Sequence, residues 1–285
     1  LSVAMSDGRI APDDPAWKYV PAWKDHPQKS RITIRHLATH SSGIEDAELS
    51  REEQAQSFAA GQTRSQRHMT LPGWKGAFWR RDPNPFTIAR DEAPVAFPPG
   101  TQFAYSNPGI GMLDYAIAAS LRGGAHEDTL SLLRERIMRP IGVDDDDWEI
   151  SYGTGYRTDG LTLYAGWGGG SHTARAIARV GRLMLRKGNW EGRQLLSAAV
   201  VEASTRDAGT PIPDRSCDPQ PACGLSWWVN FDGAMRSLPR DAFAGAGAGN
   251  QMLVVVPSLD LIVVRQGQQD GGRFWAWAEE NLFQP

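Results

Sequence analysis

The chain has 285 residues, of which 41% are hydrophobic and 22% are charged, and its formal net charge at pH 7 is −3. This length is enough for one large domain or two coupled ones with a sizeable core. A net charge this close to zero argues against nucleic acid or an anionic membrane as a partner. No apolar stretch approaches the roughly 20 residues that a membrane-spanning helix needs, so we expect no membrane span.

The first 200 residues are predicted to be mostly helical. Apolar spacing and turn signals predict helices over 51–60, 110–121, 129–138 and 174–187. Another helix is expected after Thr33, whose side chain suits an N-cap, with Gly43 as its stop signal. The polar, aromatic-rich segment up to residue 96 is predicted to form a lid or the wall of a cleft.

The last 85 residues change character. Runs rich in β-forming residues lie at Leu225–Val229, Met252–Val256 and Leu261–Arg265, and Phe274–Leu282 has the pattern of a terminal helix. Strands and a helix after a long helical region are typical of an antiparallel sheet with helices packed on it. We therefore predict an α/β (α+β) fold: a mostly helical region over 1–200, and C-terminal strands with a helix over 201–285.

The chain has two cysteines, Cys217 and Cys223, within a Pro-rich segment. Two thiols closing such a loop suit a small disulfide, which would fit an exported protein, and two free thiols are the alternative. A metal site would need more ligands, and no His lies nearby, so we expect neither a metal nor a cofactor. The compartment stays open, with a periplasmic or secreted location favoured over the cytoplasm.

The most informative motif is Tyr105-Ser106-Asn107, between Pro98-Pro99-Gly100 and Pro108-Gly109. An Asn on a turn can present both a donor and an acceptor to a substrate amide. A Tyr hydroxyl beside it can transfer a proton if a cation lowers its pKa. Tyr105 and Asn107 are therefore the candidate catalytic residues, and Ser106 between them is a candidate for substrate binding.

This motif resembles the Tyr-x-Asn element of the serine β-lactamase and penicillin-binding-protein family, in its class C β-lactamase and esterase branch. The resemblance extends to four further segments in the correct order: 1–10, 32–43, 166–175 and 243–251. It implies a β-lactamase/transpeptidase-like fold and a serine hydrolase that forms an acyl-enzyme. The implied partner is a small-molecule ester, amide or lactam.

The family's nucleophile motif, Ser-x-x-Lys, does not occur in these 285 residues. Residues 1–10 resemble the end of the helix that carries this motif in the family. We therefore expect the nucleophilic Ser and its Lys on residues before Leu1, in an N-terminal segment or a complementing chain. Because a fold lacking half of a buried helix loses more than its marginal stability, residues 1–285 are expected not to fold alone.

The family's third motif, Lys-Thr-Gly or a variant, is aligned with Gly245-Ala246-Gly247. These small residues are predicted to let the substrate carbonyl approach, and the N–H of Ala248 to donate to the oxyanion. The alternative is a Gly/Ala-rich strand edge without chemistry. A missing cation at this motif weakens the β-lactamase and peptidase interpretations, because it leaves a substrate carboxylate without a partner. Uncharged esters or amides are favoured instead.

Two other interpretations remain open. The first keeps the fold without catalysis, as an inactive binding protein or a fragment. The second places the nucleophile at Ser41 or Ser171, each close in sequence to a His. Against it, Ser171 and His172 are adjacent, so their side chains need not face one another, and no acid partner is evident.

Overall fold

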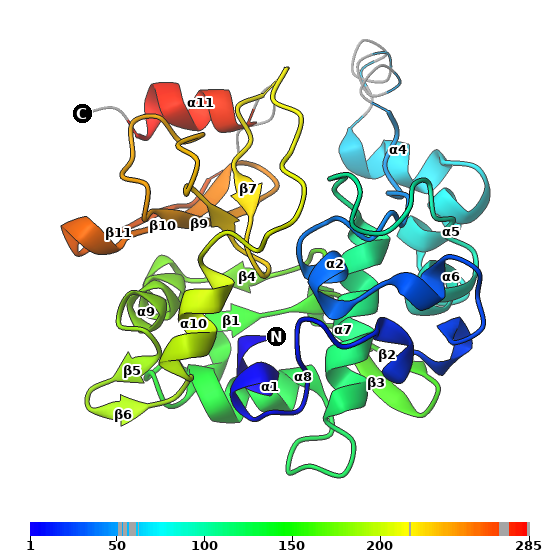
Figure 1. Cartoon of the computed structure of the whole chain (residues 1–285), viewed down its shortest axis with the longest axis horizontal. Helices are drawn as coiled ribbons and strands as arrows, with labels where there is room; N and C mark the ends of the chain where they lie inside the picture. Colours follow the sequence, from blue (N-terminus) through cyan, green and yellow to red (C-terminus); the bar gives the residue numbers. More distant parts are fainter. Residues whose placement is uncertain are drawn as a thin grey trace.

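The computed structural model describes residues 1–50, 53, 56, 61, 63–216, 218–267 and 274–283. Figure 1 shows a mainly helical half around α7 and a second half built on an antiparallel sheet. The predicted helix over 51–60 falls almost wholly outside the described residues. The helices within them are α1 (Ser2–Ser6), α2 (Ile34–Ala38), α4 (Arg64–Thr70), α5 (Gly73–Arg80), α6 (Pro85–Asp91), α7 (Asn107–Ser120), α8 (Thr129–Leu133), α9 (Ala174–Leu185), α10 (Ala198–Ser204) and α11 (Phe274–Asn281).

Helix α7 is the central helix of the helical half. Its sequence is apolar on almost every face, and residues such as Met112, Tyr115 and Ala116 are buried. A helix that is apolar all round is stable only when other elements surround it. Helices α2 and α6 and strand β3 (Leu161–Tyr164) contact α7 and provide that cover.

The main sheet has five antiparallel strands in the order β11-β10-β9-β8-β7. The strands are β7 (Ala222–Cys223), β8 (Trp228–Val229), β9 (Phe243–Gly247), β10 (Gln251–Val256) and β11 (Leu261–Arg265). Pairs of short strands lie elsewhere: β1 (Trp148–Glu149) with β4 (Ser171–His172), β2 (Gly155–Thr158) with β3, and β5 (Asn189–Trp190) with β6 (Arg193–Gln194).

Strand β10 is buried on both faces because helices cover the sheet on each side. Alternate residues of a strand point to opposite faces. Leu253 and Val255 belong to the apolar cluster that includes α9, whereas Met252 and Val254 pack in the cluster that includes α11. A β-carbon at Gly181 of α9 would lie 2.8 Å from Leu253, so glycine permits this close approach.

The predicted fold class is confirmed: a mixed fold with an antiparallel sheet flanked by helices. The predicted strands correspond to β8, β10 and β11, and α11 is the terminal helix. Helix α9 packs on β10 and β11. Helices from both predicted regions, 1–200 and 201–285, therefore pack on the sheet. Several short strands lie before residue 200. No helix among the described residues is long and apolar enough to cross a membrane.

Candidate functional site

A cavity of about 330 Å³ lies where α7 meets the ends of β8 and β9. In the same orientation as Figure 1, the space-filling view shows hydrophobic atoms exposed in the centre of this face, among hydrophilic ones. The residues that line the cavity are mostly apolar or aromatic. They are Leu1, His40, Tyr105, Ile110, Leu113, Asp114, Ile117, Gly166, Cys223, Ser226, Trp227, Trp228, Gly245 and Ala246. An apolar cavity with a few polar groups is the usual character of a small-molecule site.

Tyr105 stands at the cavity wall, directly before α7, with 41% of its surface exposed. Its ring stacks on the imidazole of His40, with ring centres 4.1 Å apart, and lies nearly parallel to Trp228. His40 Nδ1 accepts a hydrogen bond from the N–H of Ser106 at 3.2 Å. Burial lowers the pKa of His40 to about 3, so the imidazole is neutral at pH 7. His40 therefore holds the orientation of Tyr105 without adding charge.

Asn107 is the first residue of α7 and is almost fully buried. Its backbone N–H and its Nδ2 both donate to Oδ1 of Asp46, each at 2.9 Å. One N–H of the side-chain amide is thereby engaged, which leaves Oδ1 to accept a hydrogen bond and the second N–H to donate one. Asp46 was not identified from the sequence, and it fixes how Asn107 is presented.

Ser106 is the N-cap of α7 rather than a surface for substrate. Its Oγ accepts the N–H of Gly109 at 2.9 Å, and only 1% of the residue is exposed. The predicted substrate contact is therefore replaced by a capping role. We expect Ser106→Ala to lower the free energy of unfolding by about 0.5–2 kcal/mol, because an N-cap acceptor is lost. Denaturant unfolding measures this, and Ser106→Thr, which keeps a neutral hydroxyl acceptor, should lose less stability than Ser106→Ala.

Strand β9 offers a free backbone edge to the cavity. The N–H of Asn230 donates to the carbonyl of Ala242 at 3.0 Å, so Ala242, Ala244 and Ala246 turn their peptide groups towards β8. Ser226 would be the partner of Ala246, but its φ is 66° and its N–H donates to Ala38. The N–H and carbonyl of Ala246 are therefore left unpaired by the sheet within the described residues, on the cavity side.

The predicted third motif is only partly at the cavity. Gly245 and Ala246 line it, whereas Gly247 pairs with Gln251 on the opposite side of β9. Ala248, the predicted oxyanion donor, lies in the exposed turn between β9 and β10. The side that a peptide group faces depends on strand register, and the sequence does not reveal register here, so the position of Ala248 relative to the cavity was not predictable from the alignment.

Asp114 is a carboxyl group that faces the cavity from α7. Its Oδ2 accepts the N–H of Gly166 at 2.7 Å, and a β-carbon at Gly166 would lie 2.1 Å from that oxygen. Removal from bulk water raises the pKa of Asp114 to about 7. The sequence analysis did not single out Asp114, because it is one acidic residue in an otherwise apolar helix.

This raised pKa predicts a pH dependence of stability. Between pH 3.8 and about 7 the folded chain holds a proton on Asp114 that the unfolded chain releases, so stability falls as pH rises through this window. From pH 5 to pH 8 we expect a loss of about 2 kcal/mol in the wild type relative to Asp114→Asn. Denaturant unfolding of both proteins at the two pH values checks this. His40 titrates in both proteins, so its contribution cancels, and parallel pH profiles would contradict the prediction.

The serines of the rival interpretation lie away from the cavity. Ser41 is fully buried, and its Oγ is 2.9 Å from Oγ1 of Thr39. Ser171 and His172 are consecutive residues of β4, so their side chains point to opposite faces. Neither pair forms a nucleophile and base. Ser226 is the serine that lines the cavity.

Cys223 is a free, buried thiol in the cavity wall, and its Sγ lies 3.6 Å from the carbonyl of Ala38. Burial raises the pKa of Cys223 to about 12, so it is not a nucleophile at neutral pH. The free thiol does not match the predicted disulfide. Cys217, the predicted partner, lies outside the described residues.

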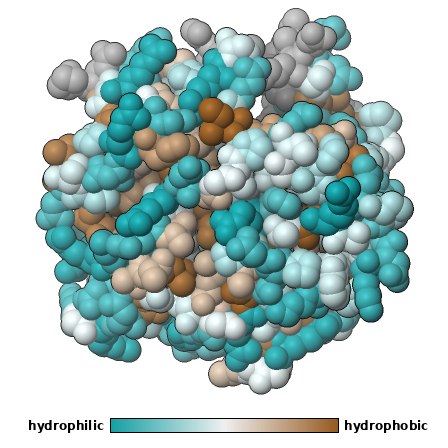
Figure 2. All heavy atoms as spheres, in the orientation of Figure 1, coloured by the Kyte–Doolittle hydropathy of each residue, from teal (hydrophilic) through white to brown (hydrophobic). Residues whose placement is uncertain are grey.

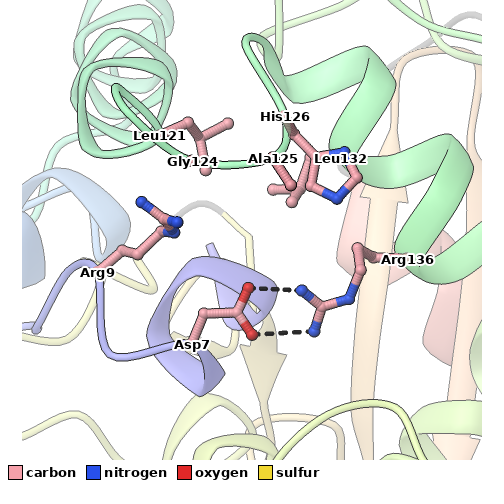
Figure 3. Close-up of a pocket in the computed structure, with 8 residues that line it drawn as sticks. All are labelled: Asp7, Arg9, Leu121, Gly124, Ala125, His126, Leu132 and Arg136. Atoms are coloured by element: carbon pink, nitrogen blue, oxygen red, sulfur yellow. Dashed lines mark hydrogen bonds and ion pairs between the residues drawn. The ribbon is translucent and has the colours of Figure 1, made fainter.

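A second, smaller cavity of about 80 Å³ lies beside the end of α1 (Figure 3). Arg136 donates two hydrogen bonds to the carboxylate of Asp7, at 2.6 and 2.9 Å. This ion pair connects the end of α1 with the π-helical segment Arg134–Met138. Its described lining contains no serine or cysteine, so it is a structural joint rather than a site for acyl transfer.

Comparisons with known proteins identify the fold and the family. No curated protein matches the chain. Three solved structures align with it: a candidate beta-lactamase from Bacteroides dorei DSM 17855 (TM-score 0.64, 15% identity), a candidate 6-aminohexanoate-dimer hydrolase from Bacillus anthracis (0.62, 19%) and unliganded simvastatin synthase from Aspergillus terreus (0.63, 18%). They cover 98%, 92% and 98% of this chain, which spans 79%, 62% and 76% of theirs.

At these identities the likenesses show the fold alone. The beta-lactamase family model, in contrast, matches residues 3–276, nearly the whole chain. Within this match lie the Tyr105–Asn107 turn, the free edge of β9 and the cavity between them. The chain belongs to the beta-lactamase family.

Proposed function

We propose that this protein is a serine hydrolase that cleaves a carbonyl substrate through an acyl-enzyme, with an ester or amide favoured over a lactam. The observation that carries the proposal is the free N–H of Ala246 at the cavity that Tyr105 also lines. A backbone N–H that points at the position of a developing oxyanion stabilises it. We therefore assign the oxyanion donor to Ala246 in place of Ala248.

Tyr105 and Asn107 supply the remaining roles in this proposal. The Tyr105 hydroxyl transfers the proton between nucleophile and leaving group, and the ring stack on His40 holds it in place. Asn107, held by Asp46, uses its Oδ1 to accept a hydrogen bond from the substrate or from the lysine of the nucleophile motif. Ala246 binds the tetrahedral oxyanion. Attack by the serine releases the alcohol or amine, and water then hydrolyses the acyl-enzyme.

We propose that the serine and lysine of the nucleophile motif stand on residues before Leu1 or on a complementing chain. In support of this, Leu1 lines the cavity, and α1 begins at the next residue. A segment joined to Leu1 would therefore lie beside Tyr105 and Ala246, which line the same cavity. Ser226 is the alternative within the described chain.

The composition of the cavity supports the choice of substrate. Its described lining contains no Lys or Arg. Apart from the lysine that the proposal assigns to the nucleophile motif, the carboxylate of a β-lactam would find no cationic side chain in the described lining. An ester or amide without a negative charge meets no such penalty, because the cavity wall is largely apolar and aromatic.

Pre-steady-state hydrolysis of p-nitrophenyl butyrate tests the proposal, with the protein produced from its full coding sequence. We expect a burst of p-nitrophenol equal to the enzyme concentration, followed by slower turnover. Ser41→Ala, Ser171→Ala and Ser226→Ala should retain the burst, and its loss in any of them would relocate the nucleophile. Absence of turnover for esters, amides and lactams alike would favour a binding protein instead.

A further inference from the structure

Asp114 is the carboxyl group of the cavity, and the described lining contains no cationic side chain. The other titratable side chains there are those of His40, Tyr105 and Cys223. His40 is neutral at pH 7, and the thiol of Cys223 is protonated. Above pH 7, where Asp114 is mostly ionised, it therefore gives the cavity a negative charge with no compensating side chain in the described lining.

The position of Asp114 is fixed by its surroundings. The N–H of Gly166 holds Oδ2 at 2.7 Å, whereas Oδ1 receives no hydrogen bond from the described residues. Ile110, Leu113 and Ile117, from the same helix, add apolar surface to the wall of the same cavity. A carboxylate held in this way has one oxygen satisfied and one left for a partner in the cavity.

Aromatic side chains line the same space. Tyr105 and Trp228 lie nearly parallel at 6.5 Å and both contribute to the wall. The face of an aromatic ring attracts a cation, and quaternary ammonium groups are bound by such faces. A carboxylate together with aromatic faces is thus the chemistry that recognises a positively charged nitrogen.

We propose that Asp114 is a specificity-determining residue, which selects substrates whose acyl group carries a positively charged nitrogen. This inference rests on the proposed hydrolase function and deepens it by naming the substrate class. The lysine of the nucleophile motif could supply the same ammonium chemistry, so the test must separate a cation on the substrate from a cation on the protein.

A matched pair of esters makes this separation. The p-nitrophenyl ester of 4-(trimethylammonio)butyrate and that of 5,5-dimethylhexanoate have the same shape and differ by one charge. For the wild type we expect kcat/KM to be about tenfold higher, or more, for the cationic ester. Asp114→Asn keeps an oxygen for the N–H of Gly166 and removes only the charge, so the ratio should fall towards one.

Each other outcome overturns the proposal. A ratio near one in the wild type means that the cavity does not select charge. If Asp114→Asn lowers kcat/KM for both esters by the same factor, Asp114 acts on the catalytic lysine and not on the cation of the substrate. An unchanged ratio in Asp114→Asn excludes this residue as the source of selectivity.

Binding of butyltrimethylammonium, followed through tryptophan fluorescence, needs no turnover. Tight binding by the wild type, weakened about tenfold in Asp114→Asn, would support the cation site even if neither ester were hydrolysed. In that case the hydrolase proposal alone would fail. Hydrolysis of both esters without any binding of the cation would keep the hydrolase proposal and refute the cation site.

Discussion

Replacing Ala246 by proline is expected to lower kcat for ester hydrolysis by about 10²–10³-fold, the usual effect of losing one oxyanion donor. Proline has no backbone N–H, and the N–H of Ala246 points away from β10 to the free edge. No hydrogen bond of the sheet is lost, and proline is tolerated at such an edge. The measurement is steady-state hydrolysis of p-nitrophenyl butyrate, with the melting temperature as a check on folding.

Ala248→Pro is the matched control, because Ala248 lies two residues further along, in the turn. It changes the same residue type at an exposed position, so kcat should stay within a fewfold of the wild type. The opposite result, with Ala248→Pro inactive and Ala246→Pro active, would return the oxyanion donor to the position first predicted from the sequence. If both variants are as active as the wild type, neither of these two N–H groups is the oxyanion donor.

Replacing Tyr105 by phenylalanine is expected to lower kcat by about 10²–10⁴-fold, as for the loss of a general acid–base group. The change removes one oxygen and keeps the ring that stacks on His40 at 4.1 Å, so the cavity wall is preserved. KM should change little. The pH dependence of kcat should also flatten, which a structural defect would not produce.

His40→Gln is the companion variant for Tyr105. It removes the ring beneath Tyr105 and keeps a group that can accept from the N–H of Ser106. We expect a smaller loss of kcat than in Tyr105→Phe, because the hydroxyl is still present but less well oriented. Full activity in Tyr105→Phe would contradict the proposed proton transfer.

The residues of the proposed site that lie together in one motif could be recognised from the sequence. Tyr105 and Asn107 could be identified because they flank a turn with its own signature. Asp46 and His40, which hold them, lie 61 and 66 residues away from the groups they bind. Such contacts depend on how α2 and α7 pack, and no local pattern in the sequence encodes that packing.

The choice between Ala246 and Ala248 as oxyanion donor, and the position of Asp114, were not predictable from the sequence for different physical reasons. Choosing between Ala246 and Ala248 requires the register of β9 and the point at which β8 ends, and both come from tertiary structure. In the sequence, Asp114 is only one acidic residue in an otherwise apolar helix, without a motif around it. The proposed role of Asp114 in substrate selection depends on the cavity that its side chain faces, and that cavity is formed only in the tertiary structure. The strands and the terminal helix, in contrast, were predictable because their residue types are locally consistent.

The central claim is that this protein is a serine hydrolase that forms an acyl-enzyme. Its most direct test is the intact mass of the purified protein before and after treatment with a fluorophosphonate. The account predicts a single adduct, mapped by peptide sequencing to a serine before Leu1 or on a complementing chain, and prevented by a competing ester. An adduct on Ser226, Ser41 or Ser171 would contradict the assignment of the nucleophile. Absence of any adduct would contradict the hydrolase itself.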